Sequence, residues 1–178
     1  MNLETNRLIL RKYSIENLQD YYSLKSCRDV WKYSTNNTIM DMDVLRKQLL
    51  EIIINQKGYN FGFCALFEKA SNNYIGGAGI LSINKSANSC VIGYNLLPLY
   101  WNKGYATEIT KEIIKYAFSI LELERIEALA MQLNIASCKV LEKSGLIEES
   151  IQKHFSKRDG IYYDVVHYGI VRADYNIK

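Results

Sequence analysis

Histidine, cysteine and proline are scarce in this sequence, and their scarcity excludes several kinds of site. The 178 residues include one proline, two histidines and four cysteines. The cysteines form no C-x-x-C pair, and neither histidine stands at a metal-ligand spacing from them, so we expect no metal site. Scattered cysteines in a chain without a signal peptide are typical of reduced, buried thiols in the cytoplasm. The cysteines are Cys27, Cys64, Cys90 and Cys138.

A charge excess of one sign and long apolar runs are also missing. The net charge of +3 is small and evenly spread, which argues against a nucleic-acid partner. No apolar run approaches the roughly 18 residues of a membrane span, so we expect no membrane partner. The excess of lysine over arginine and the many asparagines are typical of an AT-rich bacterial genome. We expect a single cytoplasmic domain spanning residues 1–178, as a monomer or homodimer.

Strands and helices are predicted to alternate along the chain, from the periodicity of the apolar residues. Strands are predicted at 7–13, 60–68, 74–84, 89–97, 125–131, 146–157 and 161–175. Helices are predicted at 14–25, with Ser14 as N-cap, and at 41–56, 104–121 and 134–144, with Gly58 and Gly145 closing the second and the fourth. The last two strands are joined by the hairpin turn Arg158-Asp159-Gly160. This order predicts a mixed α/β (or α+β) fold and not a barrel of parallel units.

The clearest feature is the loop YWNKGYATE at residues 100–108, where a predicted strand ends and the long helix begins. The N–H groups of a first helical turn have no partner inside the helix and lie at the positive end of its dipole, so they favour an anion. Gly104 would let a phosphate approach the backbone closely, and Ala106 keeps the first turn uncluttered. The alternative is that Gly104 is only a turn glycine and Ala106 a core residue.

Two further segments carry candidate ligand groups. Asn134 and Ser137 are three residues apart and share a helical face; alternatively, Asn134 is simply the N-cap of that helix. Gly93, inside the strand at 89–97, indicates either a bulge that leaves N–H groups available to a ligand or packing under an aromatic neighbour. The run GGAG at 76–79 is followed by no helix, so it predicts tight packing within a strand and not a dinucleotide site.

Together these segments resemble the GNAT superfamily of acetyl-CoA-dependent N-acyltransferases. WNKGYATE resembles its glycine loop, N-x-x-S-x-x-V-L-E-K-S-G-L its later helix, and VIGYNLLPLYW the strand before the loop. The opening TNRLILRKYSIENL and the closing YYDVVHYGIVRADY resemble the RimJ/RimL branch, which includes ribosomal-protein alanine N-acetyltransferases. The resemblance covers nearly the whole chain. It implies a central, mostly antiparallel mixed sheet of about seven strands flanked by about four helices.

The resemblance also implies an enzyme and suggests roles for its residues. The co-substrate would be acetyl-CoA, with no metal. The CoA pyrophosphate would be held by the backbone of Lys103, Gly104, Tyr105, Ala106 and Thr107, and the pantetheine arm by main-chain groups of Asn95, Leu96 and Leu97. Asn134 would contact the cofactor through its side chain, and Ser137 would be the catalytic residue near the thioester sulfur. Leu141 departs from the tyrosine acid of many members, and Val91 from the glutamate of many branch members.

The chemistry of the reaction then bears on the acceptor, a primary amine that must lose a proton. At pH 7 this costs about 1 kcal/mol for an α-amine of pKa about 7.7 and about 4–5 kcal/mol for lysine. Without an obvious carboxylate base, the sequence favours the α-amine of a peptide or protein N-terminus. Asp164 and His154 are possible proton acceptors, or else a strand-pairing carboxylate and a half-buried imidazole. The other possibilities are acetylation of a small amine (amino acid, antibiotic or polyamine) and a non-catalytic acyl-CoA-binding domain.

Overall fold

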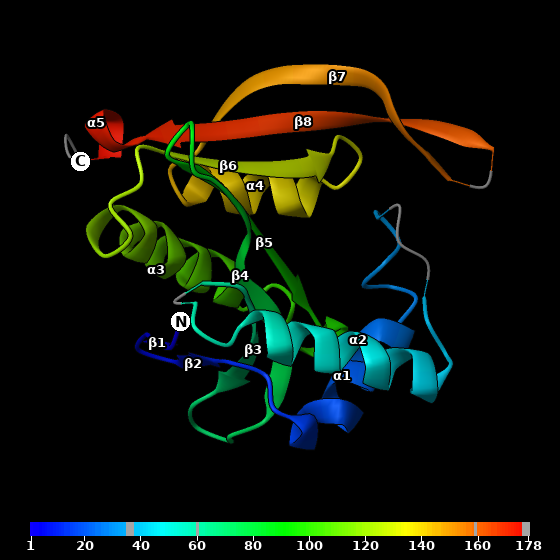
Figure 1. The fold of residues 1–178 in the computed structure, drawn as a ribbon. Helices are drawn as coiled ribbons and strands as arrows, with labels where there is room; N and C mark the ends of the chain where they lie inside the picture. Colours follow the sequence, from blue (N-terminus) through cyan, green and yellow to red (C-terminus); the bar gives the residue numbers. More distant parts are fainter. Residues whose placement is uncertain (35–37, 60, 159, 176–178) are drawn as a thin grey trace.

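Eight strands join one sheet in the computed structural model, which describes residues 1–34, 38–59, 61–158 and 160–175 (Figure 1). The strands are β1 (Leu3–Glu4), β2 (Leu8–Arg11), β3 (Phe63–Glu68), β4 (Tyr74–Asn84), β5 (Ser89–Leu96), β6 (Arg125–Met131), β7 (Ile147–Arg158) and β8 (Ile161–Val171). The α-helices are α1 (Leu18–Ser26), α2 (Met42–Asn55), α3 (Tyr105–Ser119), α4 (Ile135–Lys143) and α5 (Arg172–Tyr175). Two 3-10 turns, Ile15–Asn17 and Pro98–Tyr100, precede α1 and the loop before α3. The predicted mixed α/β class is confirmed.

The sheet is antiparallel except at its centre. Its strand order is β1-β2-β3-β4-β5-β6-β8-β7, and β5 runs parallel to β6. Within the described chain, the pairing of these two strands extends from Ser89 to Val91, opposite Arg125 to Glu127, and then stops. The remaining neighbours are antiparallel. The sheet therefore opens along one seam, between the later parts of β5 and β6.

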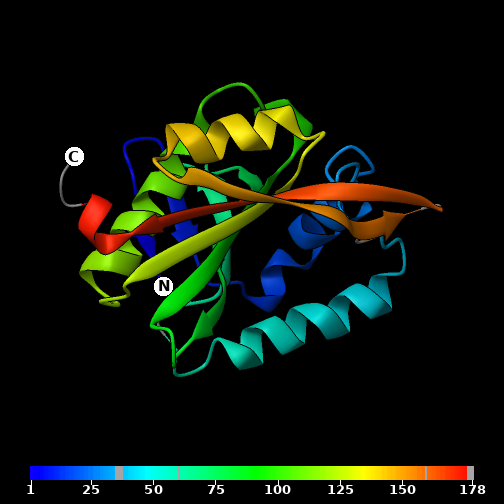
Figure 2. The ribbon, with the colours of Figure 1, turned by 90° about the horizontal axis from the view of Figure 1, so that it is seen from above.

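Helices cover both faces of this sheet. Ile109 and Ile113 of α3 and Cys138 of α4 belong to one buried cluster, which includes every second residue of β5 as far as Leu96. A second buried cluster, on the opposite face, contains side chains of α1 and α2, among them Leu45. Figure 2 shows α4 and α2 on opposite sides of the sheet. Because both faces are covered, the open seam connects two different helical layers.

Local sequence accounts for most helix boundaries. The Asp41 carboxylate accepts hydrogen bonds from the N–H groups of Asp43 and Val44 at 2.8 and 3.1 Å, so α2 begins as predicted. The apolar face of α3 is buried as its periodicity predicts, with side chains such as Ile109 and Ala117 fully covered. Gly145 takes a left-handed φ of +99° directly after the C-cap of α4.

Some predicted boundaries were wrong. The strand predicted at 161–175 ends at Val171, because the Arg172 guanidinium donates to the Leu123 carbonyl at 2.8 and 3.0 Å and the chain turns into α5. The helix predicted from Ser14 starts as a 3-10 turn. The C-cap of α2 is Gln56 and not Gly58. β1 was not predicted, because a strand of two residues is too short to show an alternation of apolar side chains. Asp159 of the predicted hairpin and Asn60 of a predicted strand lie outside the described residues.

The glycines of β4 and β5 pack closely, as predicted for the GGAG run. A Cβ on Gly76 would lie 2.1 Å from the Asn95 carbonyl oxygen. The bulge predicted at Gly93 falls instead on β4, where the register shifts between Ile80 and Ser82. The neighbour that a Cβ on Gly93 would meet is aliphatic, the Leu81 side chain at 2.9 Å. The extra residue of the bulge therefore turns its side chain over Gly93.

Candidate active site

The main chain of β5 is directed into the open seam at two positions. The Leu97 N–H donates to the Ile75 carbonyl at 2.9 Å, on the β4 side. Successive residues of an antiparallel strand turn their N–H groups to opposite sides, so Tyr94 and Leu96 direct theirs away from β4. The Leu96 carbonyl accepts from the Trp101 indole at 2.6 Å. The seam is thus bordered by strand groups that lack a strand partner there.

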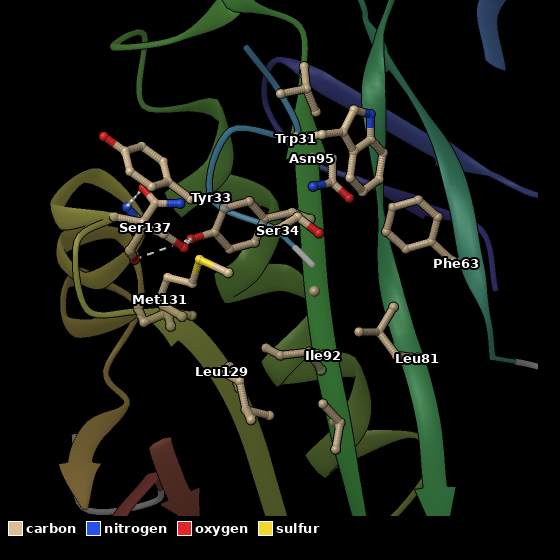
Figure 3. A pocket seen from close by; sticks show the side chains of 18 residues that line it. Trp31, Tyr33, Ser34, Phe63, Leu81, Ile92, Asn95, Leu129, Met131 and Ser137 are labelled. Carbon is tan, nitrogen blue, oxygen red and sulfur yellow. Dashed lines mark hydrogen bonds between the residues drawn. The ribbon is translucent and has the colours of Figure 1, made fainter. Parts of the chain in front are cut away.

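A cavity of about 270 Å³ lies in this seam (Figure 3). One part of its wall comes from β5 and α4, including Asn95, Asn134 and Ser137. Another part comes from the segment after α1, including Trp31 and Tyr33. The two parts belong to opposite helical layers, so two molecules could approach the cavity from different sides.

Tyr94 and Ser137 meet at the α4 side of the cavity. Their hydroxyl oxygens lie 2.9 Å apart, and the Tyr94 hydroxyl also donates to the Ser137 carbonyl at 3.2 Å. Burial raises the pKa of Tyr94 to about 12, so its hydroxyl keeps its proton at neutral pH. No motif in the sequence marks Tyr94 as functional, although its alternation with Ile92 and Leu96 places it on the α3–α4 face.

Asn134 caps α4, which was the structural alternative for this residue. Its Oδ1 accepts the Ser137 N–H at 3.2 Å. The structure also brings Asn134 and Ser137 to the cavity wall, together with Leu141 and Val91. Leu141 and Val91 are two positions where the sequence departs from the pattern of the superfamily. Both line the cavity, where Leu141 provides no hydroxyl and Val91 no carboxylate.

The glycine loop lies where β5 leads into α3. Gly104 is the N-cap of α3 and adopts a left-handed conformation, with φ +79° and ψ 1°, without a side-chain cap. The first N–H that closes the helix is that of Glu108, which donates to the Gly104 carbonyl at 3.0 Å. The N–H groups of Tyr105, Ala106 and Thr107 therefore have no acceptor in the helix. Lys103 and Gly104 are exposed, so an anion could reach these groups.

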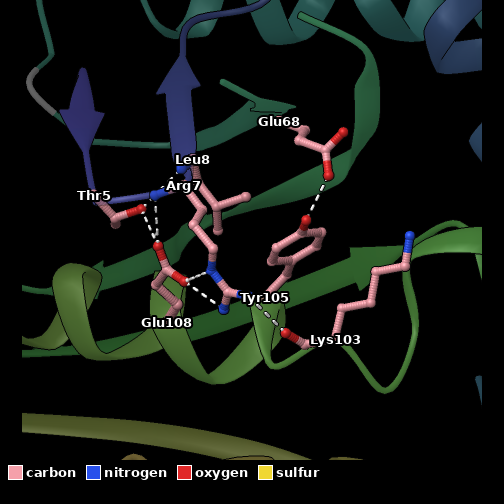
Figure 4. A network of polar contacts seen from close by, with 7 residues as sticks. All are labelled: Thr5, Arg7, Leu8, Glu68, Lys103, Tyr105 and Glu108. Atoms are coloured by element: carbon pink, nitrogen blue, oxygen red, sulfur yellow. Dashed lines mark hydrogen bonds and ion pairs between the residues drawn. The ribbon is translucent and has the colours of Figure 1, made fainter. Parts of the chain in front are cut away.

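Residues from the start of the chain hold this loop (Figure 4). The Arg7 guanidinium donates to the Lys103 carbonyl at 3.0 Å and pairs with the Glu108 carboxylate at 2.6 Å. It also lies over the Tyr105 ring, 4.6 Å from the centroid. Burial would raise the pKa of Glu108, but hydrogen bonds from Thr5 and Arg7 outweigh it and hold the pKa below its usual value. The sequence carried no signal for this network, because its members are about a hundred positions apart.

The two candidate bases lie away from the cavity wall. The Asp164 carboxylate accepts from the His154 N–H at 2.9 Å and from the Lys153 ammonium at 3.0 Å. The His154 hydrogen bond, followed by that from Lys153, lowers the pKa of Asp164. His154 stacks on the Tyr162 ring, with centroids 5.1 Å apart. Neither Asp164 nor His154 lines the cavity.

The described ranges contain no candidate for a metal site or for a membrane-spanning helix. No three histidine, cysteine or carboxylate side chains there are grouped closely enough to bind a metal ion. Among the same residues, no helix combines the length and the apolar character that crossing a bilayer requires.

Comparison with known proteins identifies the family. The family description "Acetyltransferase (GNAT) domain" matches residues 7–147, which is most of the chain. The chain belongs to the GNAT acetyltransferase family. This GNAT enzyme is an N-acetyltransferase that uses acetyl-CoA and acts on an amine.

Three similar proteins show how far the likeness extends. "Uncharacterized N-acetyltransferase YoaA" of Bacillus subtilis is 28% identical over 173 residues, covering 96% of each chain. The GNAT enzyme also matches the fold of spermidine N-acetyltransferase from Vibrio cholerae, solved with CoA and spermine, at 22% identity and a TM-score of 0.83, covering 97% and 99% of the two chains. Ribosomal-protein-S5-alanine acetyltransferase from Vibrio fischeri matches at 18% identity and a TM-score of 0.85, covering 98% of each. At these identities the two solved structures establish the fold alone.

Proposed function

We propose that this enzyme acetylates the α-amine of a peptide or protein N-terminus, as a member of the RimJ/RimL-like branch. The observation that carries the proposal is the composition of the cavity wall: within the described residues it contains no carboxylate and no imidazole. An acceptor must then supply its own neutral amine. An α-amine does so at a cost of about 1 kcal/mol at pH 7, against about 4–5 kcal/mol for a lysine-like amine.

The cofactor site of the proposal uses two parts of the structure. The N–H groups of the first turn of α3 would bind the CoA pyrophosphate, at Lys103, Gly104, Tyr105, Ala106 and Thr107. Gly104 supports this assignment, because its missing Cβ leaves the N-terminus of α3 uncovered. The pantetheine arm would lie in the seam beside Asn95 and Leu96. Both main-chain groups of Leu97 are already hydrogen-bonded, to Ile75 and Tyr100, so its role would be limited to packing.

The chemical groups of the proposal lie on α4 and β5. Acetyl-CoA supplies the acetyl group as a reactive thioester. Asn134 uses its Oδ1 to cap α4, so its contact with the cofactor would be made by Nδ2. Ser137 Oγ would hydrogen-bond the sulfur, and Tyr94 Oη, which keeps its proton at neutral pH, would hydrogen-bond Ser137 Oγ, so the pair would stabilise the departing thiolate. This pair would replace the hydroxyl that Leu141 lacks.

We propose that the enzyme works in the cytoplasm of a bacterium. All four cysteines of the described chain are free thiols, and three of them are buried. Thiols of this kind persist in a reducing compartment.

Release of CoA, followed with a thiol reagent over a panel of N-terminal peptides and amines, tests the proposal. We expect an acetylated peptide α-amine, identified by mass spectrometry of the product. Preferred turnover of an amino acid, antibiotic or polyamine would assign the enzyme to small amines instead. If acetyl-CoA binds but no acceptor releases CoA, the chain is an acyl-CoA-binding domain.

A further inference from the structure

The wall of the seam cavity is uncharged. Eighteen described residues line it, and none of them carries a charge at neutral pH. Apart from β5 and α4, this wall consists mainly of aromatic and aliphatic side chains, namely Trp31, Tyr33, Phe63, Leu81, Leu129 and Met131. The Trp31 indole N–H already donates to the Leu24 carbonyl at 2.9 Å. The cavity therefore presents ring faces and methyl groups to whatever enters it beside the cofactor.

Lys25 and Arg158 contact the 31–34 segment of this wall. The Lys25 ammonium lies 4.4 Å from the centroid of the Trp31 ring. The Arg158 guanidinium, at the end of β7, donates to the carbonyls of Trp31, Lys32 and Ser34 at 2.6, 3.1 and 3.4 Å. These contacts hold the 31–34 segment against the cavity. The described part of the wall itself offers no carboxylate that could pair with a second positive charge on an acceptor.

A second hollow continues from the first. Its volume is about 160 Å³, and Tyr33, Leu129 and Met131 belong to the walls of both. Phe155 and Ser156 of β7 line its other side. The Ser156 hydroxyl is buried and has no hydrogen-bond partner among the described residues. A buried hydroxyl without a partner is costly, so a ligand group that bonds to it would be favoured.

These observations extend the proposed function, on which the inference rests. We infer that the acceptor is a monoamine whose amine is joined to an apolar or aromatic body, and that acceptors with a second positive charge are rejected. The ring and methyl surfaces of the wall favour the apolar body, because binding removes both surfaces from water. Ser156 would hydrogen-bond an uncharged polar group farther along the acceptor, such as a peptide carbonyl.

A matched acceptor panel tests the inference. The panel contains tetrapeptides that differ only in their first residue (Phe, Leu, Ser, Asp or Lys), together with phenethylamine and spermidine. We expect kcat/KM to be about 10- to 100-fold higher for the Phe and Leu peptides than for the Asp and Lys peptides, and higher for phenethylamine than for spermidine. Equal or better turnover of spermidine or of the Lys peptide overturns the inference, while acetyl transfer itself still stands.

A variant of the wall makes the test specific to this cavity. Leu81 is 55% exposed, so Leu81→Glu adds a carboxylate to the wall without opening the core. We expect a loss of about tenfold for the Phe peptide, a gain for spermidine, and an unchanged KM for acetyl-CoA. Leu50→Glu, on the exposed side of α2, is the matched control and leaves both acceptors unchanged. Equal behaviour of the two variants contradicts the inference.

A substitution at Ser156 distinguishes the two sources of such an amine, a peptide and a small molecule. Ser156→Ala should lower kcat/KM several-fold for the Phe peptide and leave phenethylamine unchanged if the acceptor is a peptide. If phenethylamine turns over and the peptides do not, the apolar class stands and the peptide assignment fails. If no amine turns over, the proposed function fails, and the inference is decided by thermal shift of the CoA-bound protein. Stabilisation by phenethylamine but not by spermidine supports it, and any other pattern overturns it.

Discussion

The hydroxyl groups of Tyr94 and Ser137 lie 2.9 Å apart, joining β5 to α4 across 43 positions of sequence. Tyr94 belongs to the strand that borders the seam, and Ser137 to the first turn of the helix above it. The chain thus places an O–H group at the cavity from a strand, where Leu141 on α4 cannot provide one. The pair is the part of the site whose role is most directly open to mutation.

Removal of either hydroxyl should slow the chemical step more than it weakens cofactor binding. A hydrogen bond that strengthens as the thiol departs acts mainly on kcat, and a neutral bond is worth about 0.5–1.5 kcal/mol. We expect Ser137→Ala and Tyr94→Phe each to lower kcat by about 3- to 10-fold with the acetyl-CoA KM nearly unchanged. The controls Ser150→Ala and Tyr162→Phe change exposed hydroxyls on β7 and β8 and should have no effect. A selective rise in KM would show that the pair serves binding.

The pH dependence of the rate should follow the acceptor and not the protein. The cavity wall has no carboxylate or imidazole among its described residues, so the free-amine fraction limits the reaction. The logarithm of kcat/KM should rise with pH at a slope near one and level off at the acceptor's own pKa. Two acceptors of different pKa, measured in the same buffers, should therefore level off at different pH values. A common plateau would identify an enzyme group, such as His154 or Asp164, as the base.

Substitution of Gly104 should weaken CoA binding. A Cβ at Gly104 would lie 3.4 Å from Arg7 Nη2, at the N-terminus of α3. We expect Gly104→Val to raise the calorimetric Kd for CoA about tenfold or more, because the side chain covers the N–H groups that would bind phosphate. Asn tolerates a left-handed φ, so Gly104→Asn covers the N–H groups with little backbone strain. Comparison of the two variants separates the effect of the side chain from that of strain.

The matched control for strain is Gly160→Val. Gly160 has a similar φ of +83°, and a Cβ there would meet nothing within 4 Å. This variant should lose stability without losing affinity for CoA. Unchanged affinity in a folded Gly104→Val protein would rule out the anion site at α3.

Acid should destabilise the protein partly through Glu108. Hydrogen bonds from Thr5 and Arg7 outweigh burial and keep its folded pKa below the unfolded value of about 4.3. The stabilisation is therefore fully present above that pH and is lost as the pH falls through the lowered, folded pKa. Between pH 6 and pH 3 the wild-type Tm should fall more than that of Glu108→Gln. The control Glu51→Gln, on the exposed side of α2, should follow the wild type.

Elements with a local signal were predictable from the sequence. The apolar period of α3, the Asp41 cap of α2 and the left-handed Gly145 after α4 each depend on residues within a few positions, so the sequence sufficed. The glycine loop and the face shared by Asn134 and Ser137 were also accessible, because a helix determines which neighbours lie together. Where the local period was short or ended in a long-range contact, as in β1 and α5, the prediction failed.

Only the tertiary structure decided which distant residues meet. Arg7 reaches Glu108 across 101 positions, and Arg158 reaches the Trp31 carbonyl across 127. The sequence pattern of β5 indicates a buried strand but not that β6 leaves it after Val91, which creates the cavity. The period of the apolar side chains shows which face of a strand or helix is buried. Which element covers that face depends on how the whole sheet packs against two helical layers. The uncharged wall, on which the proposed class of acceptor rests, is therefore a property of the fold.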